Sequence, residues 1–256
     1  MSVYEWDGYS QNKLYVGFDH FIRVFEDKVF WLGMRNVFLF ALAAFVIMNP
    51  IALILAVFVS GKTKGSRIYG IVYYLPVMLS GIVVGFVWSW MFNTDYGLVN
   101  SLLQNVGLGS WAQDWLNKPN TALIAITIAS IWQGIGGSFI LFWAGLQNIP
   151  SDFYESADLE GANFWNKLRY ITLPSINQIM TVVIILTAVG AVNTYQIVIA
   201  LTRGGPAGAT TVPIKYIFDM SQEYGNFGYA TAMSVVLGLI LFAFSLGRMY
   251  LTKKED

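Results

Sequence analysis

The chain has 256 residues, of which 56% are hydrophobic and 12% charged, whereas soluble domains carry roughly 25% charged residues, so its composition is that of a membrane protein. Its 15 basic and 15 acidic residues cancel, which leaves no net field that would favour nucleic acid or an acidic substrate. The absence of Cys and the presence of a single His, His20, exclude disulfides, thiolate nucleophiles and Cys-based metal sites.

Five runs of the sequence are long and apolar enough to cross a membrane as helices, which takes about 20 residues for a hydrocarbon core of ~30 Å. These runs lack Asp, Glu, Lys and Arg, and they cover residues 37–60, 68–92, 122–146, 176–200 and 228–247. We therefore predict an all-α polytopic membrane protein, with one domain over residues 1–256 and the membrane bundle over residues 37–248.

The short connections differ in basic residues, which concentrate on the cytoplasmic side of membrane proteins. Lys and Arg gather in the 61–67 turn, in residues 150–174 and in the C-terminal tail, so we predict these regions to be cytoplasmic and residues 1–30 to be extracellular. A hydrophilic extracellular N-terminus with no export signal is difficult to insert. We therefore expect that a first span is missing from this sequence, or else that the N-terminal segment is translocated unaided.

Three features of the first half have simple interpretations. Asn49 before Pro50 predicts a kink in the first span, with a ligand role for Asn49 as the alternative. The letters GKT at 61–63 resemble the end of a phosphate-binding loop, but Ala56 stands where its first Gly is required and no strand precedes it. Residues 96–120 are too polar to span and predict an interfacial helix and loop, with Trp111 and Trp115 at the headgroup level.

Two spans contain amides that can bind a polar ligand. Gln133 lies beside Gly134, Gly136 and Gly137, and the alternative interpretation of this cluster is close helix packing. The fourth span contains a run of polar side chains near its outer end, Asn193, Thr194, Tyr195 and Gln196. Amides and hydroxyls bind the hydroxyls of a sugar and an aromatic ring packs on its apolar face, so all five residues are candidate substrate ligands. Hydrogen bonds between helices are the alternative.

The stretch from 150 to 174 predicts a helix–turn–helix insert between two spans. Asp152 and Glu155 suit the first turn of a helix that stops at Gly161. A second, amphipathic helix, FWNKLRYI, carries Phe164, Leu168 and Ile171 on one stripe, and we expect Pro174 to end it. The insert lies on headgroups or binds a groove of another protein, and its acidic first helix favours the protein.

Two motifs resemble those of a known family. ESADLEGA at 155–162, followed by ITLP at 171–174, resembles the EAA loop in the membrane subunits of ATP-binding-cassette (ABC) importers, with Ser156 in place of the first Ala and Glu160 in place of the usual Asp. The stretch ALTRGGPAGATT at 200–211 resembles the LT-x-GGP segment of carbohydrate permeases of the maltose type. Similarities at EWDG, GFDHFIRVF and YIFDMSQEYGNFGYATAMS extend the resemblance over most of the chain. The family core usually has six spans, which agrees with a missing first one.

This resemblance implies a function without catalysis by the chain itself. The chain would form half of the translocation pathway for a sugar or oligosaccharide, in the cytoplasmic membrane of a bacterium or archaeon. Its partners would be two ATPase subunits, a second and homologous permease (or another copy of this chain), an extracellular sugar-binding protein and membrane lipid. The residues that would couple it to the ATPase are Glu155, Ser156, Ala157, Asp158, Leu159, Glu160 and Gly161.

Two other classes of function are less consistent with the residues. An ATP-independent facilitator or secondary transporter of small polar solutes is the main alternative, although secondary transporters usually place ionisable residues inside the membrane. A membrane enzyme would need a nucleophile, a metal cluster or paired carboxylates at a membrane face. We therefore predict no catalytic residues, no metal, no cofactor and no nucleic-acid partner. The GGPAGATT loop is predicted to be external, as a contact for the binding protein or as a linker.

Overall fold

The computed structural model of the protein describes residues 1–60 and 65–255, so the GKT letters, with Lys62 and Lys64 of the predicted cytoplasmic turn, lie outside the described residues. The all-α prediction is confirmed for these residues, apart from one N-terminal hairpin. Its strands β1 (Tyr4–Glu5) and β2 (Leu14–Tyr15) are antiparallel, with Tyr4 opposite Tyr15.

The rest of the described chain is mainly helical. In chain order the helices are α1 (Asp19–Glu26), α2 (Lys28–Ala43), α3 (Asn49–Ser60), α4 (Ser66–Tyr74), α5 (Gly81–Met91), α6 (Leu98–Asn105), α7 (Pro119–Gln147), α8 (Ser151–Leu159), α9 (Phe164–Lys167), α10 (Leu173–Ser175), α11 (Asn177–Val192), α12 (Tyr195–Leu201), α13 (Pro213–Gln222) and α14 (Phe227–Glu255). Two π-helical turns, η1 (Ala44–Met48) and η4 (Leu168–Thr172), and two 3₁₀ turns, η2 (Leu75–Met78) and η3 (Gly109–Trp111), complete the set.

The predicted spans are present with two corrections. Within the described residues, four helical stretches are long and apolar enough to cross a membrane: Lys28–Ser60, Pro119–Gln147, Asn177–Leu201 and Phe227–Leu251. The first begins at Lys28 and includes Arg35, because the helix continues outward beyond the apolar run. The second predicted span, 68–92, is not one straight helix: Ile68–Met78 and Gly81–Met91 meet at a bend of 95°.

The bend has a local cause in the sequence. Pro76 lies in the 3₁₀ turn η2 and has no backbone N–H to continue a helix. Leu79 and Ser80 are extended, with ψ of 142° and 147°, and the Ser80 hydroxyl then caps α5 by accepting from the Val83 N–H at 3.3 Å. The chain therefore stops one helix and starts another in a new direction.

Two other prolines follow π-helical turns. The turn η1 ends two residues before Pro50, and η4 ends two residues before Pro174. A wider turn accommodates a proline ring that would clash with the carbonyl four residues earlier in a regular α-helix. The predicted irregularity at Asn49–Pro50 is thus a π-helical turn in a continuous helix. The prediction that Pro174 ends its helix is wrong, since α10 continues through it.

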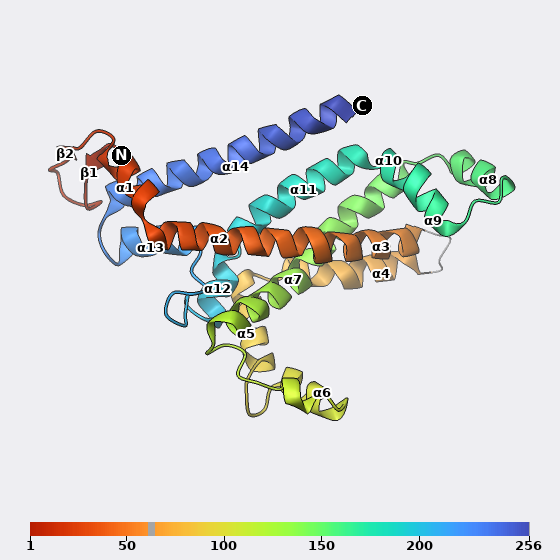
Figure 1. Ribbon diagram of the computed structural model, residues 1–256, viewed down its shortest axis with the longest axis horizontal. Helices are drawn as coiled ribbons and strands as arrows, with labels where there is room; N and C mark the ends of the chain where they lie inside the picture. Colours follow the sequence, from red (N-terminus) through yellow and green to blue (C-terminus); the bar gives the residue numbers. More distant parts are fainter. Residues whose placement is uncertain (61–64, 256) are drawn as a thin grey trace.

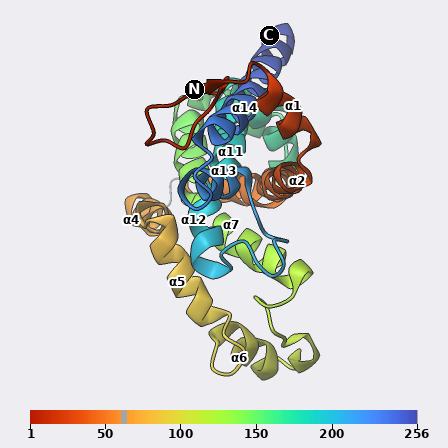
Figure 2. The same ribbon diagram turned by 90° about the vertical axis from the view of Figure 1, so that its left-hand side faces the viewer.

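The two ends of the bundle differ in structure (Figure 1). The N-terminal hairpin, α1 and α13 lie at one end, and α8 and α9 lie at the other. One buried cluster near the first end centres on Phe30, Tyr229 and Met233, and a second joins α3, α7 and α11 around Phe139 and Ile176. After the bend, α5 packs against α12, and α6 at its far end lies away from the other helices (Figures 1 and 2). Trp111 is exposed, whereas Trp115, also predicted at the headgroup level, is buried and donates to the Asn100 side chain at 2.8 Å.

Candidate functional site

A cavity of about 410 Å³ lies within the bundle, between the α4–α5 bend and the helices α7, α11 and α12. Four of the five predicted substrate ligands line it: Gln133, Asn193, Thr194 and Gln196. The fifth, Tyr195, is half-buried and is not among the residues that line the cavity. The remaining polar lining consists of hydroxyls from Thr127, Ser130, Ser138 and Thr187. The site is therefore built of amides and hydroxyls on an apolar surface, which is the composition expected for an uncharged polar ligand.

The two glutamines of the cavity hold the backbone at the bend. Gln133 of α7 donates from Nε2 to the Leu79 carbonyl at 2.8 Å, and Gln196 of α12 accepts from the Gly81 N–H at 3.1 Å. Backbone groups freed by a broken helix need partners in a membrane, where no bulk water can supply them. For these two side chains, hydrogen bonding to a neighbouring span is thus observed, and both residues also line the cavity.

The polar pair next to Gln196 marks a second break, between α11 and α12. Asn193 and Thr194 form the connection, and their side chains bond weakly to carbonyls of their own helix, at 3.3 Å to Val189 and 3.5 Å to Gly190. Neither side chain bonds to another helix among the described residues. The fourth span is therefore also interrupted where it meets the cavity, although it keeps one overall direction.

Asn49 joins three spans at the edge of the cavity. Its amide donates to the Thr187 hydroxyl at 3.2 Å, and its carbonyl oxygen accepts from the Ser138 hydroxyl at 2.9 Å. All three side chains are buried and come from α3, α11 and α7. The sequence indicates a kink here and gives no sign of the network, because Ser138 and Thr187 are distant in the chain.

The glycines of α7 serve different purposes. A Cβ at Gly136 would lie within 3.0 Å of the Tyr73 and Tyr74 backbone, so close helix packing is confirmed there, and a Cβ at Gly145, which was not among the predicted positions, would lie 2.9 Å from Ile179. A Cβ at Gly137 would meet nothing within 4 Å, and Gly137 lines the cavity. The cluster around Gln133 is therefore both a packing surface and part of the cavity wall.

The predicted insert is a helical elbow, defined as residues 151–175. The helix α8 ends in a Schellman motif: the Gly161 N–H donates to the Asp158 carbonyl at 3.1 Å and the Ala162 N–H to the Ala157 carbonyl at 2.9 Å. Gly161 has φ of +74°, as such a turn requires. Asn163 then caps α9 by accepting from the Asn166 N–H at 2.9 Å.

Contacts between its two arms brace the elbow. Asp158 of α8 pairs with Lys167 of α9, and the Tyr154 hydroxyl bonds to the buried Thr172 hydroxyl at 3.0 Å. The exposed pair contributes at most about 1 kcal/mol, so the buried contact matters more for rigidity. A second cavity, of about 440 Å³, lies between the elbow and the adjoining ends of α3 and α7.

The elbow presents an apolar and acidic outer surface. Leu159 is 91% exposed, and four aromatic side chains are exposed on the same insert: Phe153, Phe164, Trp165 and Tyr170. Of the predicted stripe, Leu168 and Ile171 are half-buried, and Phe164 is exposed. Of the predicted coupling residues, Ala157 is half-buried, and Glu155, Ser156, Asp158, Glu160 and Gly161 are exposed.

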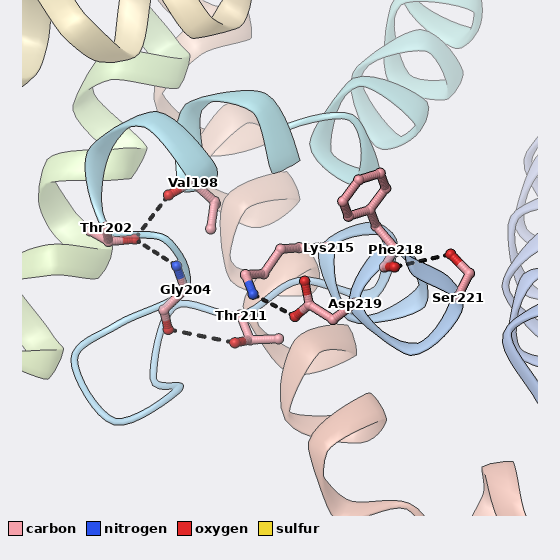
Figure 3. Close-up of polar contacts among 8 residues, drawn as sticks. All are labelled: Val198, Thr202, Gly204, Thr211, Lys215, Phe218, Asp219 and Ser221. Atoms are coloured by element: carbon pink, nitrogen blue, oxygen red, sulfur yellow. Dashed lines mark hydrogen bonds and ion pairs between the residues drawn. The ribbon is translucent and has the colours of Figure 1, made fainter. Parts of the chain in front are cut away.

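The GGPAGATT loop joins α12 to α13 and is closed at its base by hydrogen bonds (Figure 3). The Thr202 hydroxyl bonds to the Thr210 hydroxyl at 2.7 Å, and the Gly204 carbonyl accepts from Thr211 at 3.5 Å. Arg203 and Ala207 have positive φ, an uncommon state for residues with a Cβ. The Lys215–Asp219 pair of α13, 2.5 Å apart, packs beside Gly204.

Asn36 of α2, which sequence reasoning missed, holds this loop. Its amide donates to the carbonyls of Ala209 at 2.8 Å and Thr211 at 2.9 Å, and the residue is 1% exposed. Its position as the one amide in an apolar stretch of α2 is a signal that could have identified it. The loop is thus more than an unstructured linker.

Asp27, at the same end of the bundle, was also missed. One carboxylate oxygen caps α2 through the N–H groups of Val29 and Phe30, and the other accepts from the hydroxyls of Tyr216 at 2.8 Å and Tyr229 at 2.6 Å. Burial opposes the charge, but the hydrogen bonds from Tyr229, Phe30 and Tyr216 outweigh it and lower the pKa of Asp27. Burial and the same carboxylate raise the pKa of Tyr216.

Comparisons with known proteins agree on one family. Residues 48–254 match the family described as "Binding-protein-dependent transport system inner membrane component". The probable ABC transporter permease protein YurN of Bacillus subtilis is 31% identical, with an alignment covering 100% of this chain and 89% of that protein. The diacetylchitobiose uptake system permease protein NgcF of Streptomyces coelicolor is 32% identical over 94% of this chain and 71% of its own length.

A solved structure shares the fold. A bacterial ABC transporter involved in the import of the acidic polysaccharide alginate superposes with a TM-score of 0.82 at 22% identity, covering 97% of this chain and 86% of that chain. The family match and the relatives lead to the same assignment. The chain belongs to the family of binding-protein-dependent transport system inner membrane components, and its relatives are permease proteins of ABC transporters.

Proposed function

We propose that this permease forms half of the pathway through which an ABC importer carries a sugar or oligosaccharide. The family membership supplies the transport role, and a curated relative is named for the uptake of diacetylchitobiose. The cavity supports a saccharide substrate, because its amides and hydroxyls match the hydrogen-bonding groups of sugar hydroxyls. Gln133, Asn193, Thr194 and Gln196 are the proposed ligands, and Tyr195 lies beside them on α12.

The elbow is the proposed joint with a separate ATPase subunit. The observation that carries this proposal is an exposed helix, α8, at one end of the bundle, with Leu159 91% exposed beyond any contact with the other spans. Large exposed apolar side chains at a defined helix mark a protein interaction site. The residues proposed to contact the ATPase are those of the predicted motif, Glu155, Ser156, Ala157, Asp158, Leu159, Glu160 and Gly161.

A braced elbow can transmit movement into the bundle. α8 follows α7 after a short connection, and the Tyr154–Thr172 contact joins it to the segment that leads into α11. Both α7 and α11 line the cavity. Closure of two ATPase subunits would therefore move two walls of the cavity and change the side to which it opens. In this arrangement the elbow and the C-terminus face the cytoplasm, ATP is hydrolysed by the partner, and a second permease completes the pathway.

The test is a crosslink from the elbow in the assembled transporter. Because the natural chain has no Cys, Leu159→Cys introduces a single thiol. A maleimide crosslinker at this thiol is expected to capture the ATPase subunit. Tyr9→Cys is the matched control, since Tyr9 is 81% exposed in the N-terminal segment at the opposite end. Capture of the ATPase by Tyr9→Cys instead, or by neither variant in an active complex, would contradict the proposed joint.

A further inference from the structure

The bend in the second span places two backbone groups in need of partners at the cavity wall. The Leu79 carbonyl belongs to the extended connection between η2 and α5, and the Gly81 N–H is the first of α5. Each finds a glutamine from a different span, Gln133 from α7 and Gln196 from α12. The bend is therefore held from two sides by side chains that also line the cavity.

These backbone partners fix the direction of each amide. A carbonyl can only accept, so Gln133 must turn its NH₂ toward Leu79; an N–H can only donate, so Gln196 must turn its oxygen toward Gly81. The opposite groups are the Gln133 oxygen and the Gln196 NH₂. Among the described residues, neither of these two groups has a protein partner.

Space around the bend reinforces this geometry. A Cβ at Gly81 would lie 2.8 Å from both Cβ and Oε1 of Gln196, so only glycine lets the two approach this closely. The Gln196 side chain therefore lies tightly against the bend, where its oxygen bonds to the Gly81 N–H.

We propose that Gln133 and Gln196 determine which substrates the permease accepts, as a fixed acceptor and a fixed donor that read neighbouring hydroxyls of an uncharged saccharide. This inference rests on the proposed sugar transport. It adds which amide accepts and which donates a hydrogen bond to the sugar, and it gives the bend in the second span a role in orienting them. The bend acts as a positioning element, because its two backbone groups orient both amides before substrate arrives. A substrate then binds without an entropic cost for ordering these side chains.

The experiment reads substrate in the cavity directly and without a binding protein. Gly137→Cys places a single thiol in the cavity wall, where a Cβ meets nothing within 4 Å, and maltose, trehalose, lactose and diacetylchitobiose are tested for protection of this thiol from maleimide in the assembled transporter. Gly238→Cys on α14, equally open at its Cβ but absent from the cavity lining, is the control that sugar should not protect.

Substitutions of the two amides separate the inference from the proposed function. Gln133→Met and Gln196→Met are each expected to raise the sugar concentration that gives half protection by about tenfold. A tenfold change corresponds to the loss of one hydrogen bond whose net contribution is near the upper end of the usual range. Unchanged protection in both variants would overturn the inference and leave sugar transport standing. Failure of every sugar to protect Gly137→Cys with both glutamines intact would overturn the proposed function as well.

A pH profile identifies the donor role even if the Met variants fold poorly. In Gln196→Glu the protonated acid keeps an oxygen for the Gly81 N–H and offers an O–H to the sugar, whereas the ionised acid keeps the first bond and loses the donor. Protection should therefore be close to that of the unsubstituted amide at low pH and fall as pH rises, with little change in the unfolding temperature. A profile as flat as that of the parent protein would contradict the assignment of Gln196 as donor.

Discussion

At the residue scale, Asn36 shows how a single buried amide can position a loop. Both of its bonds go to carbonyls of the loop that follows α12, and both partners are remote from Asn36 in the sequence. Asn36→Leu keeps the size of the side chain but leaves two carbonyls without a donor, so we expect a loss of about 1–3 kcal/mol in the free energy of unfolding. Thermal unfolding of the purified protein measures this loss.

The control for this prediction is Asn148→Leu. Asn148 is exposed and donates only to the Ala144 carbonyl of its own helix, so its replacement should change stability by less than about 0.5 kcal/mol. Equal effects of the two substitutions would show that Asn36 contributes no more than a surface amide.

Asp27 makes stability depend on pH with a defined sign. Its pKa in the folded protein is lowered, so its stabilising contribution is complete above the unfolded pKa of about 3.9 and is lost as pH falls through the lower folded value. Asp27→Asn cannot ionise and should unfold at a lower temperature at neutral pH, with the difference from the parent protein shrinking below about pH 4. Melting curves at a series of pH values measure that difference, and a gap that stays constant with pH would refute it.

At the element scale, neighbouring glycines of α7 give a matched pair. Gly136→Ala forces a methyl group into the backbone of Tyr73 and Tyr74 and should destabilise the protein by about 1–3 kcal/mol. Gly137→Ala meets open space and should raise helix stability by up to about 1 kcal/mol. Shifts of opposite sign in the unfolding temperature are expected, and a similar shift for both would contradict the close α4–α7 contact.

The elbow offers a second matched pair. Gly161 and Gly225 have φ of +74° and +61°, and a Cβ added at either position would meet no atom within 4 Å, so the negative φ of proline strains both turns, and at Gly161 proline also removes the N–H bond to the Asp158 carbonyl. Gly161→Pro should abolish ATP-driven uptake, because it disrupts the turn between α8 and α9 while leaving the bundle folded. Gly225→Pro should retain most uptake, as measured with labelled sugar in cells at equal membrane expression. Loss of uptake in both, or in neither, would remove the special role of the elbow.

Sequence reasoning located elements well where periodicity and composition decide them. The apolar runs identified the spans, and Gly161 with its acidic preceding helix identified the elbow. The bend at 79–81 was missed because an uncharged apolar run looks the same whether it is straight or broken, and its stabilising amides come from distant spans. For the same reason Asn49 looked like a kink marker, while its partners, Ser138 and Thr187, are long-range contacts.

At the scale of the whole molecule, the permease combines a neutral polar cavity with an exposed elbow at one end of the bundle. Four of the five candidate ligands line the cavity as expected, because amides in an apolar span are conspicuous in sequence. Tyr195 was predicted as a ligand because it lies between Thr194 and Gln196 in the sequence. It lies on α12 but is not among the residues that line the cavity. The helix is interrupted at Asn193–Thr194, so the spacing of residues in the sequence could not predict which side chains of α12 face the cavity.

The most direct measurement is sugar uptake into proteoliposomes that contain the complete transporter with its binding protein. If the chain is a permease driven by a separate ATPase, labelled sugar accumulates above its external concentration only when ATP reaches the elbow side, and uptake stops when the ATPase subunits are omitted. Equilibration of sugar across the membrane at the same rate without ATP or ATPase would contradict that dependence and identify the chain as a facilitator.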